Sequence, residues 1–512
     1  MDERSITCIQ EKAVVNVEKR TKIREIANIT CMHIKQRNQK EEKESGMMGN
    51  NKTEQRKFGW RDKLGYLFGD FGNDFTFILS SGFLLKFYTD VMGVSAAVVG
   101  IVMMVARFAD AFTDVAMGRI CDRAEMKAAG KFKPWILRMC GPVAIASFLI
   151  YQSGLADMPL WFKTGWLFVT YILWGSVFYT AINIPYGSMA SAVSAEPGDR
   201  QSLSTYRSIG GTLAGLIIGA GVPIFAYKND GAGNTVLDGG SFTIISGVFS
   251  LLAVGCYLLC YMLTTERVKF SMDVKQKSEN SSVFVMLKNA AGNRALISII
   301  AASVVMLLAQ LTMQSMANYV YPNFYGNATA QSVSTITMVI AMFVAAGLAK
   351  PLSVRFGKAE VSVVSNLLAA VVCFLVFLIR PENVWMYVGL MTLCWLGLGL
   401  FSMVNWSLIT DVIDYSELRN GVREDGSVYA MYSFARKVGQ AAAAGVSGGL
   451  LTWIGYSETT AFDPQVTLGI FNISTLVPAA GFLLLALVLW FWYPLHKKQV
   501  EANVEALKNK RK

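Results

Sequence analysis

Charged residues are scarce in this chain. Asp, Glu, Lys and Arg make up 16% of its 512 residues, whereas 53% are hydrophobic. A soluble globular protein has roughly 25% charged residues, so much of this surface must face something other than water. The apolar residues form long blocks, and a helix that crosses a bilayer needs about 20 mostly apolar residues. Alternating strands of about ten residues, typical of an outer-membrane barrel, are absent from the pattern. These features predict an all-α integral membrane protein.

Histidine is nearly absent, and the cysteines show no metal-binding pattern. His33 and His496 lie outside the apolar blocks, and none of the 8 cysteines belongs to a CxxC pair. Ser/His/Asp and Cys/His catalysis both need an imidazole base, so such a site within the membrane is excluded. Cys256 and Cys260 share a helix face, but two thiols without His or acidic neighbours are a poor metal site. We therefore expect no enzymatic activity and no resident cofactor.

The net charge of +11 is explained by the loops rather than by nucleic acid. Lys and Arg gather between the apolar blocks, and cytoplasmic loops of membrane proteins carry an excess of these residues. The lipid bilayer is therefore an expected partner and nucleic acid is not. Because the basic loops, the polar stretch in the middle of the chain and the basic C-terminus fall on one side, we expect both termini to be cytoplasmic. The expected location is the cell inner (plasma) membrane, with multiple passes.

The pattern predicts twelve spans in two sets of six. The first set covers about 64–91, 95–121, 134–154, 161–189, 204–227 and 241–265. The second set covers about 295–322, 331–354, 360–379, 383–413, 427–455 and 467–494. We therefore predict an N-terminal half at 58–265, a cytoplasmic linker at 266–294, a C-terminal half at 295–495 and a basic cytoplasmic tail at 496–512. Duplicated halves around a midplane site are the usual plan of secondary transporters.

The first 57 residues do not belong to this plan. They are polar, charged and aperiodic, and they lack the apolar region of a secretory signal. One interpretation is a polar cytoplasmic N-terminal tail. The other is that translation starts at Met47 or Met48, so that the preceding residues lie upstream of the true start.

Ionisable residues inside the predicted spans are the first candidates for function, because a charge at the bilayer centre costs at least ~2.5–3.5 kcal/mol. Asp110 and Asp114 are four residues apart and share one helix face. Two neighbouring carboxylates repel each other unless a cation or a proton lies between them. The alternative is a structural ion pair with Arg107, but one arginine can neutralise only one of the two acids. The other candidates within the spans are Asp74, Arg207 and Lys437.

Polar residues interrupt the first and fourth spans. Asn73 and Asp74 lie near glycines in the first span, and their donors and acceptors suit sugar hydroxyls; hydrogen bonding between helices is the alternative. Asn183 and Pro185 interrupt the fourth span. Proline frees a carbonyl that can ligate an ion, although a plain kink explains it equally well. Lys86, nearer to a helix end, is explained by snorkelling or by packing against a loop.

Glycine and tryptophan add two weaker signals. Gly211, Gly215 and Gly219 form a stripe of small residues in the fifth span, which is typical of close helix packing. Trp174 and Trp406 lie well inside spans. They are candidates for stacking on a sugar ring, but most tryptophans of membrane proteins lie in interfacial belts.

Specific motifs between about Phe58 and Pro494 carry a family resemblance. They include Lys63-Leu-Gly-Tyr-Leu-Phe-Gly-Asp-Phe-Gly-Asn-Asp, Ala106-Arg-Phe-Ala-Asp-Ala-Phe-Thr-Asp and Asn183-Ile-Pro-Tyr-Gly-Ser. They resemble motifs of the glycoside–pentoside–hexuronide:cation symporters of the major facilitator superfamily, of the melibiose-permease type. The resemblance implies the major facilitator fold, with twelve transmembrane helices in two six-helix pseudo-repeats. It also implies cation-coupled symport of a sugar, glycoside or uronide by alternating access.

The resemblance assigns roles to individual residues. It implies a site for a monovalent cation, with Asp110 and Asp114 as the metal-ligating carboxylates and with Thr113 and Thr180 beside them. Na⁺ is the expected coupling ion, with H⁺ or Li⁺ as alternatives. The implied substrate-binding residues are Asp74, Asn73, Tyr179, Asn183, Arg207 and Lys437.

Departures from the family pattern limit what can be said of the cargo. Thr113-Asp114-Val115 stands where the melibiose-permease type has Asn-Asp-Pro, which weakens any inference about the cation. Asn183 replaces an acid and Gly187 a tryptophan, so a melibiose-like substrate is not expected. One alternative is a symporter of a lipid or a sulfonated solute. Another is a membrane sensor that binds a sugar without moving it, although the tails are too short for a soluble output domain.

Overall fold

The computed structural model describes residues 56–124, 126, 129–268, 293–420 and 425–510. Met1–Lys57 and Phe58–Lys512 form two units, and the second unit is described below by itself. Almost all of the predicted tail at 1–57 and of the predicted linker at 266–294 lies outside the described residues.

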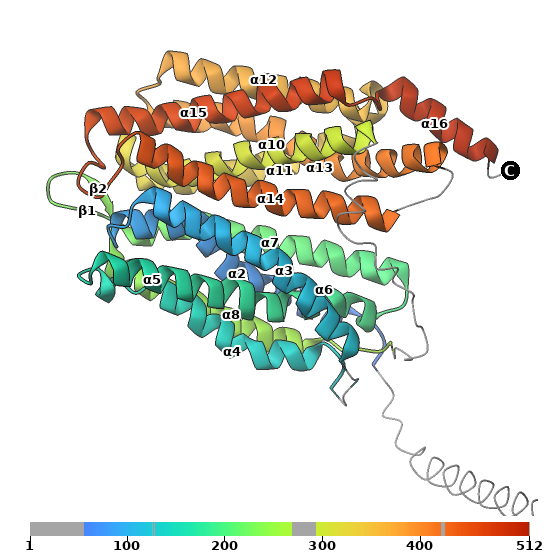
Figure 1. The fold of residues 1–512 in the computed structure, drawn as a ribbon, viewed down its shortest axis with the longest axis horizontal. Coiled ribbons are helices and arrows are strands. Elements are labelled where there is room, and N and C mark those ends of the chain that lie inside the picture. Colours follow the sequence, from blue (N-terminus) through green and yellow to red (C-terminus); the bar gives the residue numbers. More distant parts are fainter. Residues whose placement is uncertain (1–55, 125, 127–128, 269–292, 421–424, 511–512) are drawn as a thin grey trace, which may run out of the picture. The chain divides into compact units, whose positions relative to one another are not determined.

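The first set of helices has a small hairpin before its last helix. It comprises α2 (Trp60–Asp90), α3 (Ala96–Arg123), α4 (Lys133–Ile150), α7 (Pro197–Ala226) and α8 (Gly239–Leu263). Its fourth span is a continuous run of α5 (Leu160–Ile172), η2 (Leu173–Tyr179) and α6 (Thr180–Val193), and a short turn, η1 (Ser153–Leu155), precedes it. Between α7 and α8, β1 (Tyr227–Asn229) pairs antiparallel with β2 (Thr235–Leu237). We call this end of the helices the hairpin end (Figure 1).

Asp238 begins the last helix of this set. It accepts a hydrogen bond from the Ser241 amide at 2.8 Å and pairs with the Lys228 ammonium at 2.7 Å. These bonds lower the pKa of Asp238 to about 2, and the bond from Lys228 contributes most. A carboxylate at this position satisfies free amides at the start of a helix, so the hairpin is tied to α8.

The second set follows the same plan. It comprises α10 (Arg294–Tyr319) with η3 (Val320–Phe324), α11 (Ala328–Phe356), α12 (Lys358–Ile379), α13 (Val384–Asn420), α14 (Asp425–Trp453), and α15 (Pro464–Leu487) with η4 (Val488–Trp492). A final helix, α16 (Lys497–Lys510), occupies most of the predicted basic tail. The end at which α8 finishes and α10 begins is called the linker end.

Ten of these spans are long and apolar enough to cross a membrane by length and composition alone. The long helices α2 and α14 are not among them, because each carries charged residues along its length: Asp70, Asp74 and Lys86 in α2, and Arg436 and Lys437 in α14. Both pack against several other helices, α2 against α7, α8 and α10, and α14 against α3 and α10. Their polar groups can therefore face protein rather than lipid.

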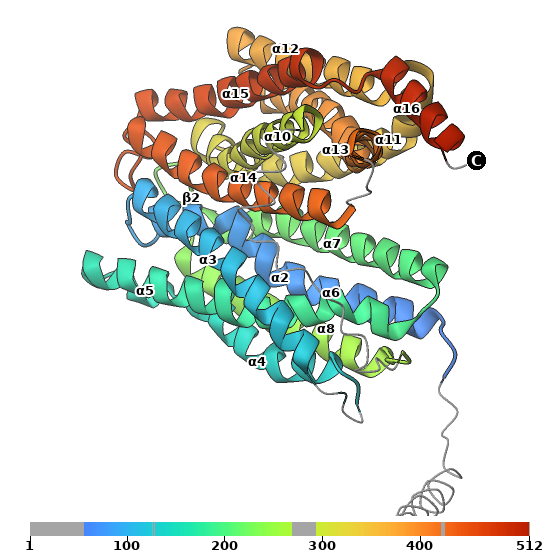
Figure 2. The same ribbon diagram turned by 45° about the vertical axis from the view of Figure 1, so that its right-hand side comes forward.

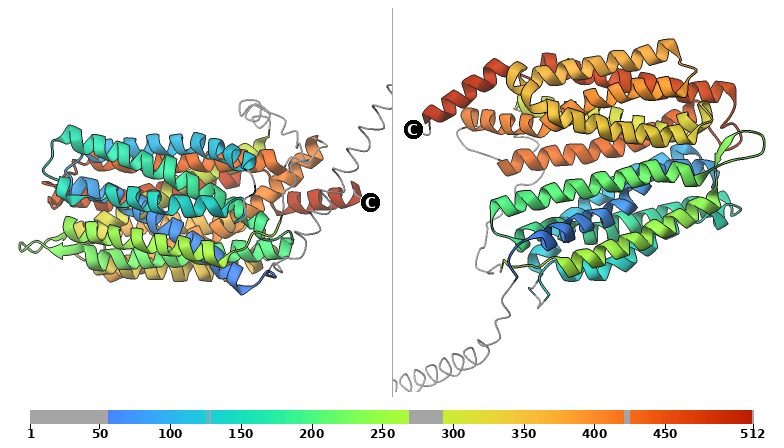
Figure 3. Two further views of the ribbon diagram at one scale, coloured as in Figure 1. Left: turned by 90° about the horizontal axis from the view of Figure 1, so that it is seen from below. Right: turned by 180° about the vertical axis from the view of Figure 1, so that it is seen from behind.

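The two sets repeat one packing arrangement. In the first set α2 packs against α7 and α8, and in the second set α10 packs against the corresponding α14 and α15. Likewise α4 packs against α8, and α12 against α15. The seam between the sets is formed by α3 with α14 and by α7 with α11, and the two layers are seen in Figures 2 and 3. This duplication confirms the predicted fold class of two six-helix pseudo-repeats.

A buried polar cluster joins the two sets at the hairpin end. The Lys86 ammonium of α2 pairs with Asp90 at 2.6 Å and donates to Asn323 at 2.6 Å and to the Tyr456 hydroxyl at 3.0 Å. It also lies 4.4 Å from the centre of the Tyr319 ring. Lys86 is only 1% exposed, so snorkelling is the wrong explanation for it. These five residues are called the hairpin-end lock.

Candidate functional site

Two carboxylates of α3 face the fourth span. The Ser176 hydroxyl donates to Asp110 Oδ1 at 2.6 Å, and the Thr180 hydroxyl donates to Asp114 Oδ1 at 3.0 Å. Ser176 and Thr180, four residues apart on the fourth span, thus face two acids that are four residues apart on α3. The predicted grouping of Asp110, Asp114 and Thr180 is therefore present in the structure.

A wide helical turn supplies those hydroxyls. Residues Leu173–Tyr179 form a π-helix between α5 and α6, and single π turns within α-helices often occur at functional sites. Thr180 Oγ1 also lies 3.2 Å from the Gly175 carbonyl oxygen, to which it can donate. The π-helical winding determines which side chains of this span face α3. The periodicity of the sequence does not predict this winding.

Each acid also has a cationic neighbour. Arg107 Nη1 lies 3.4 Å from Asp110 Oδ2, and the Lys437 ammonium binds Asp114 Oδ2. Lys437 comes from α14, so this ion pair crosses the seam. The Asp110 and Asp114 side chains remain 17% and 24% exposed, which leaves their oxygens within reach of a small ion. Arg107, Asp110, Asp114, Thr180 and Lys437 are called the carboxylate cluster.

The fourth residue predicted for the cation site is oriented differently. The Thr113 hydroxyl donates to the backbone carbonyl of Asp110 at 3.2 Å. In the described part of the chain, no group of three or more His, Cys, Asp or Glu could hold a metal ion. A cation between Asp110 and Asp114 would therefore need hydroxyl, carbonyl or water oxygens to complete its shell, and hard cations accept such ligands.

A second acidic pair lies where α2 meets α7. Arg207 Nε bonds Asp70 Oδ1 at 2.9 Å, whereas Asp74 has no hydrogen-bond partner among the described residues. A Cβ atom on Gly211 would lie 2.6 Å from Asp74 Oδ2 and 3.0 Å from Asp70 Oδ2. Gly211 thus lets α7 approach both carboxylates, which agrees with the packing role predicted for the glycine stripe. Asp70 was not singled out from the sequence, although it precedes Asp74 by one turn.

Three predicted substrate residues contribute to packing between helices. Asn73 Nδ2 donates to Asn183 Oδ1 at 3.4 Å and Asn73 Oδ1 accepts from Tyr257 at 2.9 Å, so that both ends of its amide are used. Tyr179 stacks on Phe77, with ring centres 5.4 Å apart. Asn73 is 1% exposed, so its contact with a substrate would require these bonds to rearrange.

A cavity of about 690 Å³ lies between the two sets, on the hairpin side of the carboxylate cluster. It is lined by α2, α3 and α7 on one side and by α10, α11, α13 and α14 on the other. None of the six residues predicted for the substrate is among the described residues that line it. The cavity nevertheless adjoins both acidic sites, since Gly211 and Arg107 belong to its wall.

The second-half wall of this cavity was missed by the sequence analysis. It contains Gln310, Gln314, Gln440 and Trp395. The available signal was a polar residue at every fourth position of an otherwise apolar span, as in Gln310 and Gln314. The tryptophans considered for stacking lie elsewhere. Trp174 is 1% exposed between tyrosines, and the Trp406 ring is edge-on to Tyr432.

A family model and individual relatives among known proteins indicate the same family for this chain. The model of the family described as MFS/sugar transport protein matches residues 65–497. The glucuronide carrier protein homolog of Escherichia coli (strain K12) is 30% identical over 461 residues, which cover 88% of this chain and 96% of that protein. The isoprimeverose transporter of Lactiplantibacillus pentosus is 30% identical over 440 residues, covering 85% and 88%.

A solved structure supports the fold. The crystal structure of a D-xylose-proton symporter has a TM-score of 0.59 to this chain, with 14% identity, and the match covers 85% of this chain and 97% of that one. At this identity the likeness concerns the fold alone, and it agrees with the two duplicated sets of helices.

Proposed function

The chain belongs to the MFS/sugar transport protein family and is therefore a multi-pass membrane transporter of a small molecule, and from that premise we propose that it carries out cation-coupled symport of a sugar, glycoside or uronide. The family assignment confirms the resemblance to glycoside–pentoside–hexuronide:cation symporters. It also favours transport over the alternative of a sugar sensor. Na⁺ is the proposed coupling ion, with H⁺ or Li⁺ as alternatives.

The carboxylate cluster is the observation that carries the coupling proposal. Asp114 binds the ammonium of Lys437, which belongs to the other half. A cation that binds Asp110 and Asp114 would compete with this ammonium and release Lys437 from α3. Ion binding would thus change a contact across the seam, where a rocking motion of the halves must act. By linkage, the cation and the sugar then raise each other's affinity by the same factor.

The protein is proposed to lie in the inner membrane of the cell. In this orientation the linker end faces the cytoplasm. Both termini are then cytoplasmic, and the hairpin end faces outward. With the hairpin-end lock closed, access to the cavity would come from the cytoplasmic side. The lock and the carboxylate cluster would then be the two regions that rearrange during alternating access.

Uptake into proteoliposomes tests the proposed function. The purified full chain would be reconstituted and supplied with a labelled glucuronide, xyloside or isoprimeverose under an inward Na⁺, Li⁺ or H⁺ gradient, or under none. We expect at least one sugar to accumulate above equilibrium only when a gradient is present. The same extent of uptake with and without every gradient would contradict symport. Efficient accumulation of a sulfonated solute instead would favour the alternative cargo class.

Asp74 is proposed to bind the substrate rather than the ion. It lies beside Arg207 and Asp70 on the first-half side, and its carboxylate is free to accept sugar hydroxyls. We expect Asp74→Asn to weaken sugar binding about tenfold, since a hydrogen bond to a charged group contributes about 1.5–3 kcal/mol. The cation affinity measured without sugar should stay unchanged.

Binding of both ligands to the purified Asp74→Asn variant, measured by calorimetry, checks this assignment. Asp230→Asn in the exposed hairpin loop is the matched control, and it should affect neither ligand. An equal loss of sugar and cation affinity in Asp74→Asn would place Asp74 in the cation site instead.

A further inference from the structure

Three buried hydroxyls of the first half have no assigned role. They belong to Ser80 of α2, Tyr151 at the end of α4 and Tyr171 of α5, and each residue is at most 1% exposed. In the part of the chain that the structure describes, none of the three oxygens has a hydrogen-bond partner, and neither does the Trp174 indole nitrogen. Trp174 stacks on Tyr171 with ring centres 5.6 Å apart. Buried polar atoms without a protein partner indicate that water or an ion satisfies them.

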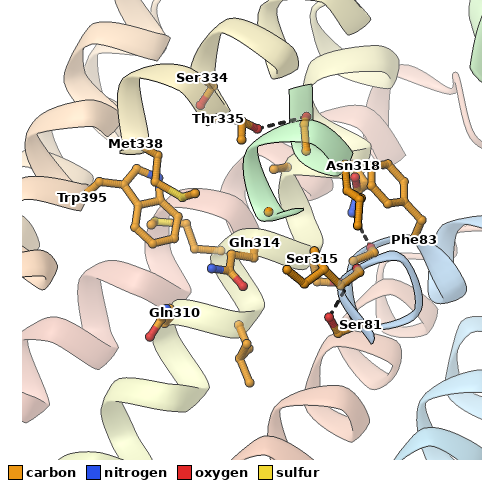
Figure 4. A pocket seen from close by; sticks show the side chains of 18 of the residues that line it. Ser81, Phe83, Gln310, Gln314, Ser315, Asn318, Ser334, Thr335, Met338 and Trp395 are labelled. Atoms are coloured by element: carbon orange, nitrogen blue, oxygen red, sulfur yellow. Dashed lines mark hydrogen bonds between the residues drawn. The ribbon is translucent and has the colours of Figure 1, made fainter. Parts of the chain in front are cut away.

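The three hydroxyls lie together, outside the cavity. The Ser80 hydroxyl is next to those of both Tyr151 and Tyr171. The neighbouring residue Ser81 belongs to the cavity wall (Figure 4). Ser80, Tyr151 and Tyr171 are not among the described residues that line the cavity. These three residues are called the hydroxyl site, and α2 separates it from the cavity.

Water suits the hydroxyl site better than an ion does. A buried water typically makes about three hydrogen bonds to groups that are otherwise unsatisfied. Each hydroxyl can both donate and accept, so two tyrosines can donate to a water that donates to Ser80. The guanidinium of Arg107 lies beside Tyr171 and would repel a cation. An anion would be repelled by Asp110, which is 3.4 Å from that guanidinium.

Arg107 links the hydroxyl site to the carboxylate cluster. A guanidinium carries five N–H donors, yet Asp110, at 3.4 Å, is the only hydrogen-bond partner of Arg107 among the described residues. The Phe77 ring packs against it, with its centre 4.7 Å from the guanidinium carbon. The Tyr171 hydroxyl is a second oxygen beside the guanidinium, and a water bound to Tyr171 would be a third. These oxygens can accept N–H groups that would otherwise turn to Asp110.

We propose that Ser80, Tyr151 and Tyr171 bind water, and that this water and the Tyr171 hydroxyl keep Arg107 from pairing tightly with Asp110. An Asp110 carboxylate that is only loosely paired is more available to a cation. Tyr171 is thus a positioning residue that acts on Asp110 through Arg107. The effect on the cation rests on the proposed function, in which Asp110 binds the coupling ion, whereas the water site does not depend on it.

Radiolytic labelling of the purified full chain tests the water site. A short X-ray pulse forms hydroxyl radicals from bound water, and mass spectrometry measures the oxidation of each tyrosine. Tyr186 and Tyr257 are the matched controls, because each is 1% exposed and its hydroxyl already donates to a protein oxygen, at 2.6 and 2.9 Å. We expect Tyr151 and Tyr171 to be oxidised several times faster than these controls. Equal rates in all four tyrosines would overturn the water site.

A serine variant verifies that the labelling comes from this water. Ser80→Ala should slow the oxidation of Tyr151 and Tyr171 to the rate of the controls. Ser246→Ala removes a buried hydroxyl that is bonded within α8 at 2.8 Å, and it should leave both rates unchanged. Rates that Ser80→Ala does not alter would contradict the assignment of Ser80 to the site.

Cation binding to a tyrosine variant tests the positioning role. Tyr171→Phe keeps the ring and removes the hydroxyl, so Arg107 should turn to Asp110 and compete with the ion. We expect calorimetry without sugar to show Na⁺ or Li⁺ affinity reduced about three- to tenfold, the range for one lost neutral hydrogen bond. Tyr88→Phe is the matched control, with unchanged affinity, because the Tyr88 hydroxyl donates to the Ile150 carbonyl at 2.9 Å.

The outcomes separate the water site, the positioning role and the proposed function. Unchanged or increased cation affinity in Tyr171→Phe overturns the positioning role, even where labelling supports the water site. If the unmodified chain binds none of Na⁺, Li⁺ and H⁺, the proposed coupling fails and the positioning role fails with it, while labelling still decides the water site. An unchanged temperature of thermal unfolding verifies that each variant is folded.

Discussion

Replacing Asp114 with asparagine is expected to abolish cation-stimulated uptake while the protein still folds. The carboxylate is held by Thr180 at 3.0 Å and by the Lys437 ammonium, and a neutral amide cannot replace it as an anionic ligand. Loss of one charge-assisted contact costs about 1.5–3 kcal/mol. At cation concentrations that half-saturate the unmodified chain, cation-stimulated uptake should therefore be lost. Uptake into proteoliposomes, titrated with Na⁺ at two pH values, measures the effect and separates Na⁺ from H⁺ coupling.

A double variant distinguishes the loss of ion binding from the effect of leaving Lys437 without its carboxylate. Asp114→Asn leaves the Lys437 ammonium, 34% exposed, without its carboxylate, which by itself could disturb the fold. Asp114→Asn combined with Lys437→Met removes both charges. If Asp114 is an ion ligand, the double variant stays insensitive to cations. Restored stimulation in the double variant, or full stimulation in Asp110→Asn and Asp114→Asn alike, would show that the acids have a structural role only.

Replacing Lys86 with methionine is expected to open the hairpin end. Methionine fills similar volume but loses the bonds to Asp90, Asn323 and Tyr456. The Lys86–Asp90 pair lies within α2, so the bonds that cross between the halves are those to Asn323 and Tyr456. A hydrogen bond to a charged group contributes about 1.5–3 kcal/mol, and we expect the closed state alone to hold these two. A shift of only about 1.4 kcal/mol between open and closed states changes their ratio tenfold. The open population should therefore increase at least tenfold.

Cysteine labelling measures that shift. Ser315 lines the cavity, so Ser315→Cys in a background without native cysteines reports access from the hairpin side to an impermeant maleimide. We expect the labelling rate to rise about tenfold or more with Lys86→Met, by the population change above. Lys228→Met is the matched control, because the Lys228–Asp238 pair lies within the first half. Equal labelling rates in the two variants would show that the lock does not hold the halves together.

The repeated helices and the charged candidates were predictable because their signals are local. Apolar blocks of span length, separated by basic loops, indicate membrane helices wherever they occur. A spacing of four residues is enough to place Asp110 and Asp114 on one helix face. The same rule, applied to α2 and α10, would have drawn attention to Asp70 and to the Gln310–Gln314 stripe.

The remaining features depend on contacts that no local pattern encodes. The role of Lys86 depends on Asn323 and Tyr456, which lie more than two hundred residues away in sequence. The meeting of Lys437 with Asp114 depends on the packing of α14 against α3. The sequence suggested that Asn73 binds substrate, and the structure shows its amide bonded to Asn183 and Tyr257. Whether a polar side chain faces a ligand or a neighbouring helix is set by the packing of the helices.

The charge balance of the carboxylate cluster has an electrical consequence. Its two aspartates are matched by Arg107 and Lys437, so the site is formally neutral when it holds no ion. One bound monovalent cation displaces Lys437 from Asp114 but leaves it in α14, so the loaded carrier is positive by one charge. Moving one charge across a membrane potential changes the energy by about 2.3 kcal/mol per 100 mV. Voltage, negative inside, would then drive the loaded carrier inward and leave the empty return step nearly unaffected. Each uncharged sugar taken up would carry an inward current, and its uptake would persist at equal ion concentrations on both sides. An anionic uronide would cancel the charge of the ion.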